Sequence, residues 1–151
     1  MSPTAHRNRF LLALVLPIVL LLQGCPKPTA ISLYNNSAGD LVVHYVDGKT
    51  EWPRGALLRL EDRELGRLVW VSVGKVRAPV LDVSNGQRTL RYPLAQIYSL
   101  PHDYVTTGNV IEMQLQLEVD GFLYAARPGQ QFPASALNPQ PNEFPVAPIV
   151  L

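Results

Sequence analysis

The segment VIEMQLQLEV, residues Val110–Val119, has the clearest pattern in the chain. From Ile111 onward every second residue is apolar, and Glu or Gln stands at each position between them. This alternation predicts a β-strand with one face in a core and the other in water, because successive side chains of a strand point to opposite faces. A helix would spread both kinds of residue around its circumference.

The residues after this strand predict a hairpin. Asp120-Gly121 is a dipeptide typical of two-residue type I′ turns, so Phe122–Ala126 is expected to fold back as the partner strand. The same chemistry predicts two more hairpins, at Asp47-Gly48 between Leu41–Val46 and Lys49–Trp52, and at Asn85-Gly86 between Val80–Ser84 and Gln87–Tyr92.

Further β-rich runs complete the set of expected strands. Ile31–Tyr34 predicts an opening strand, and Arg67–Val73 predicts another, with Trp70 as a core aromatic residue. Residues 56–65 fit either a strand or a short helix, and we favour the strand.

Seven or eight short strands predict an all-β fold for residues 30–126, an antiparallel two-layer β-sandwich of immunoglobulin-like type. A small closed β-barrel is the alternative. Cys25 is the single Cys of the chain, so no intramolecular disulfide is possible and the core must be stabilised by burial alone. A domain of this size can bury about two-thirds of its unfolded surface, which is sufficient.

Residues 127–151 contain six prolines and several apolar residues. Proline at this density excludes helix interiors and central strands. We expect an extended, polyproline-like tail that lies against the sandwich or binds in a partner's groove, with a disordered tail as the alternative.

The N-terminal region has the features of a secretion signal. Arg7 and Arg9 precede Phe10–Leu22, an uncharged run of 13 residues. A membrane-spanning helix needs about 20 apolar residues, whereas the apolar region of a signal peptide needs about 7 to 15. The run therefore predicts a signal peptide, and a signal-anchor helix is the alternative.

This run ends in Leu22-Gln23-Gly24-Cys25, which resembles the lipobox of bacterial lipoprotein precursors. The resemblance implies that signal peptidase II recognises Leu22, Gln23 and Gly24, removes residues 1–24, and leaves Cys25 as a lipidated, palmitate-bearing N-terminus. Residues 25–29 would then be the lipidated Cys and a linker. Because Pro26 and not Asp follows Cys25, the resemblance implies an outer-membrane anchor with the domain facing the periplasm.

Charge and motifs exclude several functions. The chain has a net charge of +1, and removal of residues 1–24 would take away two of the 13 Lys and Arg but none of the 12 Asp and Glu, leaving −1. A nearly neutral domain does not favour nucleic-acid binding. No Walker or G-x-G-x-x-G motif occurs, so no cofactor is expected. His44 and His102 are too few for a zinc site.

One cluster has residue types used in acid–base chemistry. His102 and Asp103 are adjacent, and Ser99 is close in sequence, but no nucleophile motif such as G-x-S-x-G accompanies them. We therefore expect an ordinary polar turn and no catalytic residue. His44 is expected on a sheet surface. A salt-bridging surface turn is expected where acidic and basic residues alternate, at Arg59, Glu61, Asp62, Arg63, Glu64 and Arg67.

The remaining possibility is surface recognition. Six aromatic residues are candidates for binding contacts or for the core: Trp52, Tyr92, Tyr98, Tyr104, Phe122 and Tyr124. We expect a non-enzymatic cell-envelope interaction or assembly module that binds a protein partner through loops at one end of the sandwich or through the tail. Deletion of residues 128–151 should then leave the thermal transition nearly unchanged. The alternatives are a periplasmic hydrolase that uses His102 and Asp103, and a carrier that holds a small ligand in a barrel interior.

Overall fold

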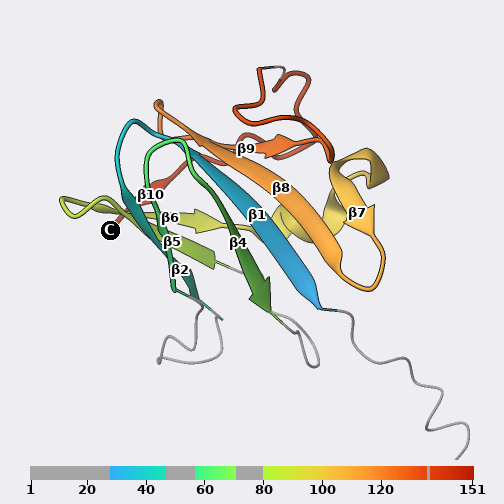
Figure 1. Ribbon diagram of the computed structural model, residues 1–151, viewed down its shortest axis with the longest axis horizontal. Coiled ribbons are helices and arrows are strands. Elements are labelled where there is room, and N and C mark those ends of the chain that lie inside the picture. Colours follow the sequence, from blue (N-terminus) through green and yellow to red (C-terminus); the bar gives the residue numbers. More distant parts are fainter. Residues whose placement is uncertain (1–27, 47–56, 71–79, 136) are drawn as a thin grey trace, which may run out of the picture.

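The computed structural model describes residues 28–46, 57–70, 80–135 and 137–151. Within these residues, strands form two sheets that pack as the layers of a sandwich (Figure 1). One sheet has the order β4-β1-β8-β7, with β9 also paired to β8, and the other has the order β10-β6-β5-β2-β3. The strands are β1 (Thr29–Asn36), β2 (Leu41–Val46), β3 (Leu57–Leu60), β4 (Leu65–Trp70), β5 (Val80–Ser84), β6 (Thr89–Pro93), β7 (Val105–Thr107), β8 (Ile111–Glu118), β9 (Leu123–Ala126) and β10 (Ile149–Val150). Two short 3-10 helices, η1 (Ala95–Ser99) and η2 (His102–Tyr104), lie between β6 and β7.

The predicted two-layer all-β sandwich is confirmed, and the alternative of a closed barrel is wrong because the two sheets stay separate. One pairing differs from the antiparallel prediction. Strands β1 and β8 run parallel, with Thr29 beside Ile111 and Asn36 beside Glu118. The other strand pairs among the described residues are antiparallel.

The core lies between the sheets, where apolar side chains from alternate strand positions meet. Ile31 and Leu33 of β1 and Leu115 and Leu117 of β8 are all buried in it. The predicted opening strand and the inward face of β8 are therefore confirmed. Val119 is the exception, because it lies beyond the end of β8 and is 70% exposed.

The hairpin after β8 is confirmed, but its turn is of another type. Glu118 N–H donates to Phe122 O (3.1 Å), and Gly121 N–H donates to Glu118 O (2.9 Å). Only Gly121 has a positive φ, 82°, while Asp120 does not. The connection is thus the common three-residue loop, a turn followed by a left-handed glycine, and not the predicted type I′ turn.

The hairpin between β5 and β6 is confirmed with its turn displaced by one residue. Asn85 N–H donates to Arg88 O (3.3 Å), so Gly86 and Gln87 are the central residues. Gly86 has φ 85°. Asn85 is outside the turn centre because its Oδ1 accepts hydrogen bonds from the N–H groups of Gln87 and Arg88, both 3.1 Å.

Strand β2 pairs with β3 at one edge, where Leu41 lies opposite Leu60, and with β5 at the other. The predicted hairpin with its turn at Asp47-Gly48 and its second strand at Lys49–Trp52 lies outside the described residues. The strand interpretation of residues 56–65 is confirmed by β3. Trp70 ends β4, and its side chain is outside the described part of the chain.

The second face of β8 is only partly in water, so the prediction for this face is wrong at Gln116. Gln116 is 1% exposed because the Pro-rich tail covers this outer face of the sheet. Phe132 of the tail stacks on Tyr34 of β1, with ring centroids 5.1 Å apart. The alternation in β8 therefore places apolar side chains in the core between the sheets and the side chain of Gln116 against the tail.

Two glutamine side chains hold the backbone of the tail against the sheet. Gln116 Oε1 accepts from Ala134 N–H (2.7 Å). Gln140, in the tail, accepts from Ala125 N–H (2.8 Å) and donates to Ala125 O (2.9 Å), as a neighbouring strand would. Proline lacks a backbone donor, so side-chain amides replace the pairing that the tail backbone cannot supply.

The end of the tail belongs to the sandwich itself. Val146 exchanges backbone hydrogen bonds with Leu123 (2.8 and 3.0 Å). Phe144 and Val146 are buried in the core. The tail then reaches the other sheet, where β10 pairs with β6 (Figure 1). Because the tail supplies core residues and a strand, deletion of residues 128–151 should lower the thermal transition, and the earlier expectation of a nearly unchanged transition is revised.

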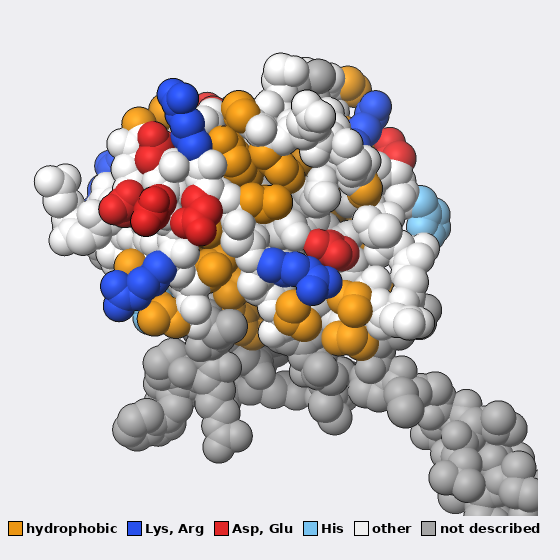
Figure 2. Space-filling view, in the orientation of Figure 1, with side chains coloured by type: hydrophobic (Ala, Val, Ile, Leu, Met, Phe, Trp, Pro, Cys, Tyr) orange, Lys and Arg blue, Asp and Glu red, His pale blue; other side chains and the backbone are white. Residues whose placement is uncertain are grey.

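The sandwich has two ends of different character. The end at which β1 begins is named here the N-terminal end. At the opposite end, named the loop end, four turns meet, at residues 37–40, 61–64, 85–88 and 119–121. Figure 2 shows several acidic side chains close together on the left of this face, and apolar side chains near its centre and its lower edge.

Candidate functional site

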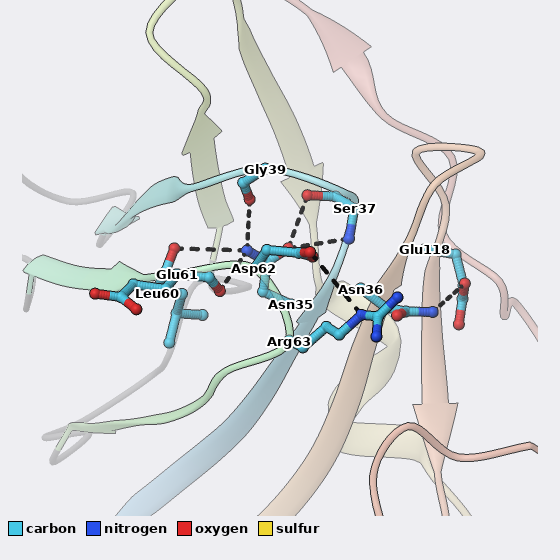
Figure 3. A network of polar contacts seen from close by, with 9 residues as sticks. All are labelled: Asn35, Asn36, Ser37, Gly39, Leu60, Glu61, Asp62, Arg63 and Glu118. Atoms are coloured by element: carbon cyan, nitrogen blue, oxygen red, sulfur yellow. Dashed lines mark hydrogen bonds and ion pairs between the residues drawn. The ribbon is translucent and has the colours of Figure 1, made fainter.

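Asn35, near the end of β1, is the centre of a polar network at the loop end (Figure 3). Its side chain is fully buried. Nδ2 donates to Gly39 O (2.7 Å) and Glu61 O (2.8 Å), and Oδ1 accepts from the N–H (3.1 Å) and the hydroxyl (2.7 Å) of Ser37. One amide therefore joins the turn after β1 to the turn after β3.

The backbone of Asn35 strengthens the same junction. Its N–H donates to Glu64 O (2.9 Å), and its carbonyl accepts from Arg63 N–H (2.8 Å). Both joined turns contain a non-glycine residue with left-handed backbone, Ala38 at φ 65° and Arg63 at φ 61°. Such conformations cost energy and persist only where the surroundings fix them. The network around Asn35 fixes both.

Further hydrogen bonds hold the end of β8 and the turn at residues 119–121. Asn36 Nδ2 donates to Glu118 Oε2 (2.8 Å), which connects the end of β1 to the end of β8. Tyr92, fully buried in the opposite sheet, donates its hydroxyl to Gly121 O (2.7 Å). Burial raises the pKa of Tyr92 to about 12. Tyr124 donates to Asp120 Oδ2 (2.9 Å), and this hydrogen bond raises the pKa of Tyr124.

The surface of the loop end is predominantly acidic. Six of its residues are acidic: Asp40, Glu61, Asp62, Glu64, Glu118 and Asp120. Among the described residues, Arg63 contacts one of them, with Nε 3.9 Å from Asp62 Oδ2, and both side chains are well exposed. The predicted salt-bridging turn is thus confirmed in part, because Arg67 contacts Glu112 of β8 (3.3 Å) and not its neighbours.

Two hollows open at this end. The larger, about 550 Å³, lies between the turns at residues 61–64 and 85–88, and three carboxylates and Arg59 line it. The smaller, about 110 Å³, lies among the turns at 37–39, 85–88 and 119–121. The Asn35 network fixes one turn beside each hollow, the turn at residues 61–64 for the larger and the turn at residues 37–39 for the smaller.

The residues considered for acid–base chemistry lie elsewhere and are not assembled. His102 and Asp103 are exposed on η2, and Asp103 pairs with Arg127 (3.7 Å). Ser99 Oγ donates to Gln96 O (2.9 Å). The described residues contain no hydrogen bond between His102 and either Asp103 or Ser99. His44 is half-buried on β2, and the described part of the chain holds no group of three or more His, Cys, Asp or Glu that could bind a metal.

The aromatic candidates divide between core and surface. Tyr92 and Tyr104 are core residues, and Tyr104 donates its hydroxyl to Pro139 O (2.6 Å) in the tail. Tyr124 is half-buried and Phe122 is exposed. Trp52 and the side chain of Tyr98 are outside the described residues.

Leu22, Gln23, Gly24 and Cys25 are also outside the described residues. No helix within residues 28–46, 57–70, 80–135 and 137–151 is long and apolar enough to cross a bilayer.

The predicted opening strand ends at Tyr34, one residue before Asn35. A signal for this residue was present, since Asn35 follows Ile31 and Leu33 at the same two-residue spacing and therefore points into the core. A polar residue at an inward position needs hydrogen-bond partners there. Comparison with family models, with curated proteins and with solved structures finds no match to this chain.

Proposed function

We propose that this chain is a lipid-anchored, non-catalytic module of the bacterial cell envelope whose loop end binds a protein partner. The observation that supports the proposal most directly is the course of β1. Thr29 begins this strand four residues after Cys25, and Asn35 lies near its other end. A strand of eight residues is about 26 Å long. A lipid on Cys25 would thus leave the loop end facing away from the membrane.

The loop end has properties that favour binding. Two of its turns, at residues 37–40 and 61–64, are fixed by the Asn35 network, and binding to fixed loops loses less conformational entropy than binding to mobile ones. Its exposed carboxylates favour a partner with a basic surface, since complementary charge increases the rate of association and excludes wrong partners.

The anchor is tested with Cys25→Ala in the native host, with Lys27→Ala as the control outside the lipobox. We expect Cys25→Ala to leave the membrane fraction and Lys27→Ala to remain in it. Mass spectrometry of the N-terminal peptide should show cleavage before Cys25 and acyl groups on it. An intact Met1 with an unmodified Cys25 would disprove the anchor.

The binding surface is tested with a photo-crosslinking amino acid placed at one exposed position at a time. Positions Asp62 and Gln87 at the loop end should crosslink to the same protein, and Thr106 on β7 should not. Glu61→Lys should reduce both crosslinks, because it reverses a charge in the larger hollow. Equal crosslinking from all three positions would contradict the proposal.

A further inference from the structure

An apolar hollow of about 170 Å³ lies at the N-terminal end of the sandwich, beside η1, η2, β7 and β8. Ile97 and Met113 line it and are buried in the core, and Leu100, Val105 and Ile111 line it with partly exposed side chains. The ligand that fits such a lining is an uncharged apolar group, because a charged group would lose its hydration without finding a partner.

The polar residues of the hollow are few. Thr29, Thr107 and His102 complete its lining, and His102 is the one ionisable group among them. Asp103, its neighbour in sequence, pairs with Arg127 outside the lining. Nothing in this lining can neutralise a carboxylate or a phosphate at close range except His102. The hollow therefore favours a hydrocarbon chain over a charged headgroup.

The size of the hollow fits part of a hydrocarbon chain. An apolar cavity of about 150 Å³ in another protein binds benzene, a molecule of six carbon atoms. A hollow of about 170 Å³ therefore accommodates a chain segment of similar carbon number. A whole membrane-spanning acyl chain would not fit.

The position of the hollow relative to Cys25 indicates where the hydrocarbon chain comes from. Thr29 lines the hollow, and Cys25 is four residues before it. Four extended residues span at most about 14 Å. A lipid attached to Cys25 would start within about this distance of the hollow. It could not move further away while the polypeptide between Cys25 and Thr29 is intact.

We propose that this hollow binds part of one acyl chain of the lipid on Cys25. The inference rests on the proposed function, because only lipidation brings such a chain to the hollow. An acyl chain in a bilayer is already shielded from water, so the favourable change comes from the apolar lining, which loses its contact with water when the chain enters. The bound chain holds the N-terminal end against the membrane and the loop end away from it.

The test uses the full-length protein in its native host, grown with a fatty acid that carries a photoactivatable diazirine. After illumination, mass spectrometry identifies what the labelled chain has reacted with. We expect a crosslink between the N-terminal lipopeptide and a peptide within residues 97–113. Such a crosslink joins two peptides of the same polypeptide. A phospholipid acyl chain in the hollow would instead add the mass of the phospholipid to the peptide that it reacts with.

Thr107→Trp and Thr106→Trp are matched variants on β7, since both residues are exposed but only Thr107 lines the hollow. If the Trp side chain itself covers about 55 Å² of the apolar lining, the acyl chain no longer gains from burying that area, and its occupancy of the hollow falls about tenfold. We expect this loss for Thr107→Trp and none for Thr106→Trp. The wild-type crosslink map tests the proposal even if one variant fails to fold.

Each remaining outcome overturns the proposal in a recognisable way. If the labelled acyl chain on Cys25 reacts only outside residues 97–113, binding in the hollow is disproved, whereas the lipid anchor on Cys25 is supported. A phospholipid adduct at the hollow disproves the assigned source of the chain. The absence of any label on the protein disproves both this inference and the proposed function.

Discussion

The two ends of the sandwich are organised by different interactions. At the loop end, turns from both sheets are joined by hydrogen bonds that meet at the buried side chain of Asn35. At the N-terminal end, the hollow is lined by apolar residues such as Ile97 and Met113. Hydrogen bonds are directional and fix the geometry of loops, whereas apolar burial is non-directional and admits a flexible ligand. This difference supports the two proposed roles, recognition of a partner at the loop end and contact with lipid at the N-terminal end.

The distribution of charge follows the same division. Six of the acidic residues in the described part of the chain are at the loop end, and Asp103, close to the other end, is paired with Arg127. Anionic lipids give a membrane surface a negative potential, which repels carboxylates. Electrostatic repulsion and an anchor at Cys25 would therefore orient the domain in the same direction.

The two ends can have separate roles only if both sheets fold as one unit. Phe144 provides the strongest test of this condition. Phe144 is part of the tail but is buried in the core between the sheets. We expect Phe144→Ala to lower the free energy of unfolding by about 3 to 5 kcal/mol, the usual cost of removing a buried aromatic ring. Phe122→Ala is the control, since Phe122 is exposed, and should cost much less. Urea unfolding measures both, and equal effects would show that the tail is not part of the core.

The rigidity of the loop end depends on Asn35. Asn35→Ala leaves the carbonyls of Gly39 and Glu61 without their donor and should destabilise the protein by about 2 to 3 kcal/mol. Asn36→Ala removes one hydrogen bond from a half-buried residue and should cost less than about 1 kcal/mol. Hydrogen exchange should increase at residues 37–40 and 61–64 in Asn35→Ala only. Exchange that rises uniformly would mean that no local network exists.

These residues also show what the sequence could and could not predict. The β8–β9 hairpin was predictable because alternation and turn residues are local signals. The parallel pairing of β1 with β8 and the docking of the tail on Gln116 join segments that are far apart in the sequence, and no local pattern encodes them. The turn types differed because side chains such as that of Asn85 bind the turn backbone and move its centre.

Tyr92 gives the link between the sheets a pH dependence. Burial raises its pKa to about 12 in the folded protein, while the unfolded chain ionises near 10. The unfolded state therefore loses its proton first, and stability is complete below pH 10 and falls as the pH rises toward 12, by up to about 2 kcal/mol. Between pH 9 and 12, the free energy of unfolding should fall less steeply with pH in Tyr92→Phe than in the wild type. Tyr124→Phe, at a more exposed site, should retain most of the wild-type slope.

The smallest expected effect concerns the acidic surface of the loop end. The triple variant Glu61→Gln, Asp62→Asn, Glu64→Gln keeps the hydrogen-bond acceptors and removes three neighbouring charges. At low salt it should stabilise the protein by a few tenths of a kcal/mol, because like charges repel each other, and the gain should disappear at about 1 M salt, where the screening length is about 3 Å. Asp103→Asn should have the opposite sign, because Asp103 is paired with Arg127. Thermal unfolding at several salt concentrations shows whether each of the two variants is more or less stable than the wild type. If the triple variant destabilises the protein at low salt, the pairing of Asp62 with Arg63 outweighs the repulsion among the three carboxylates, and the contrast in charge between the two ends is smaller than the count of acidic residues indicates.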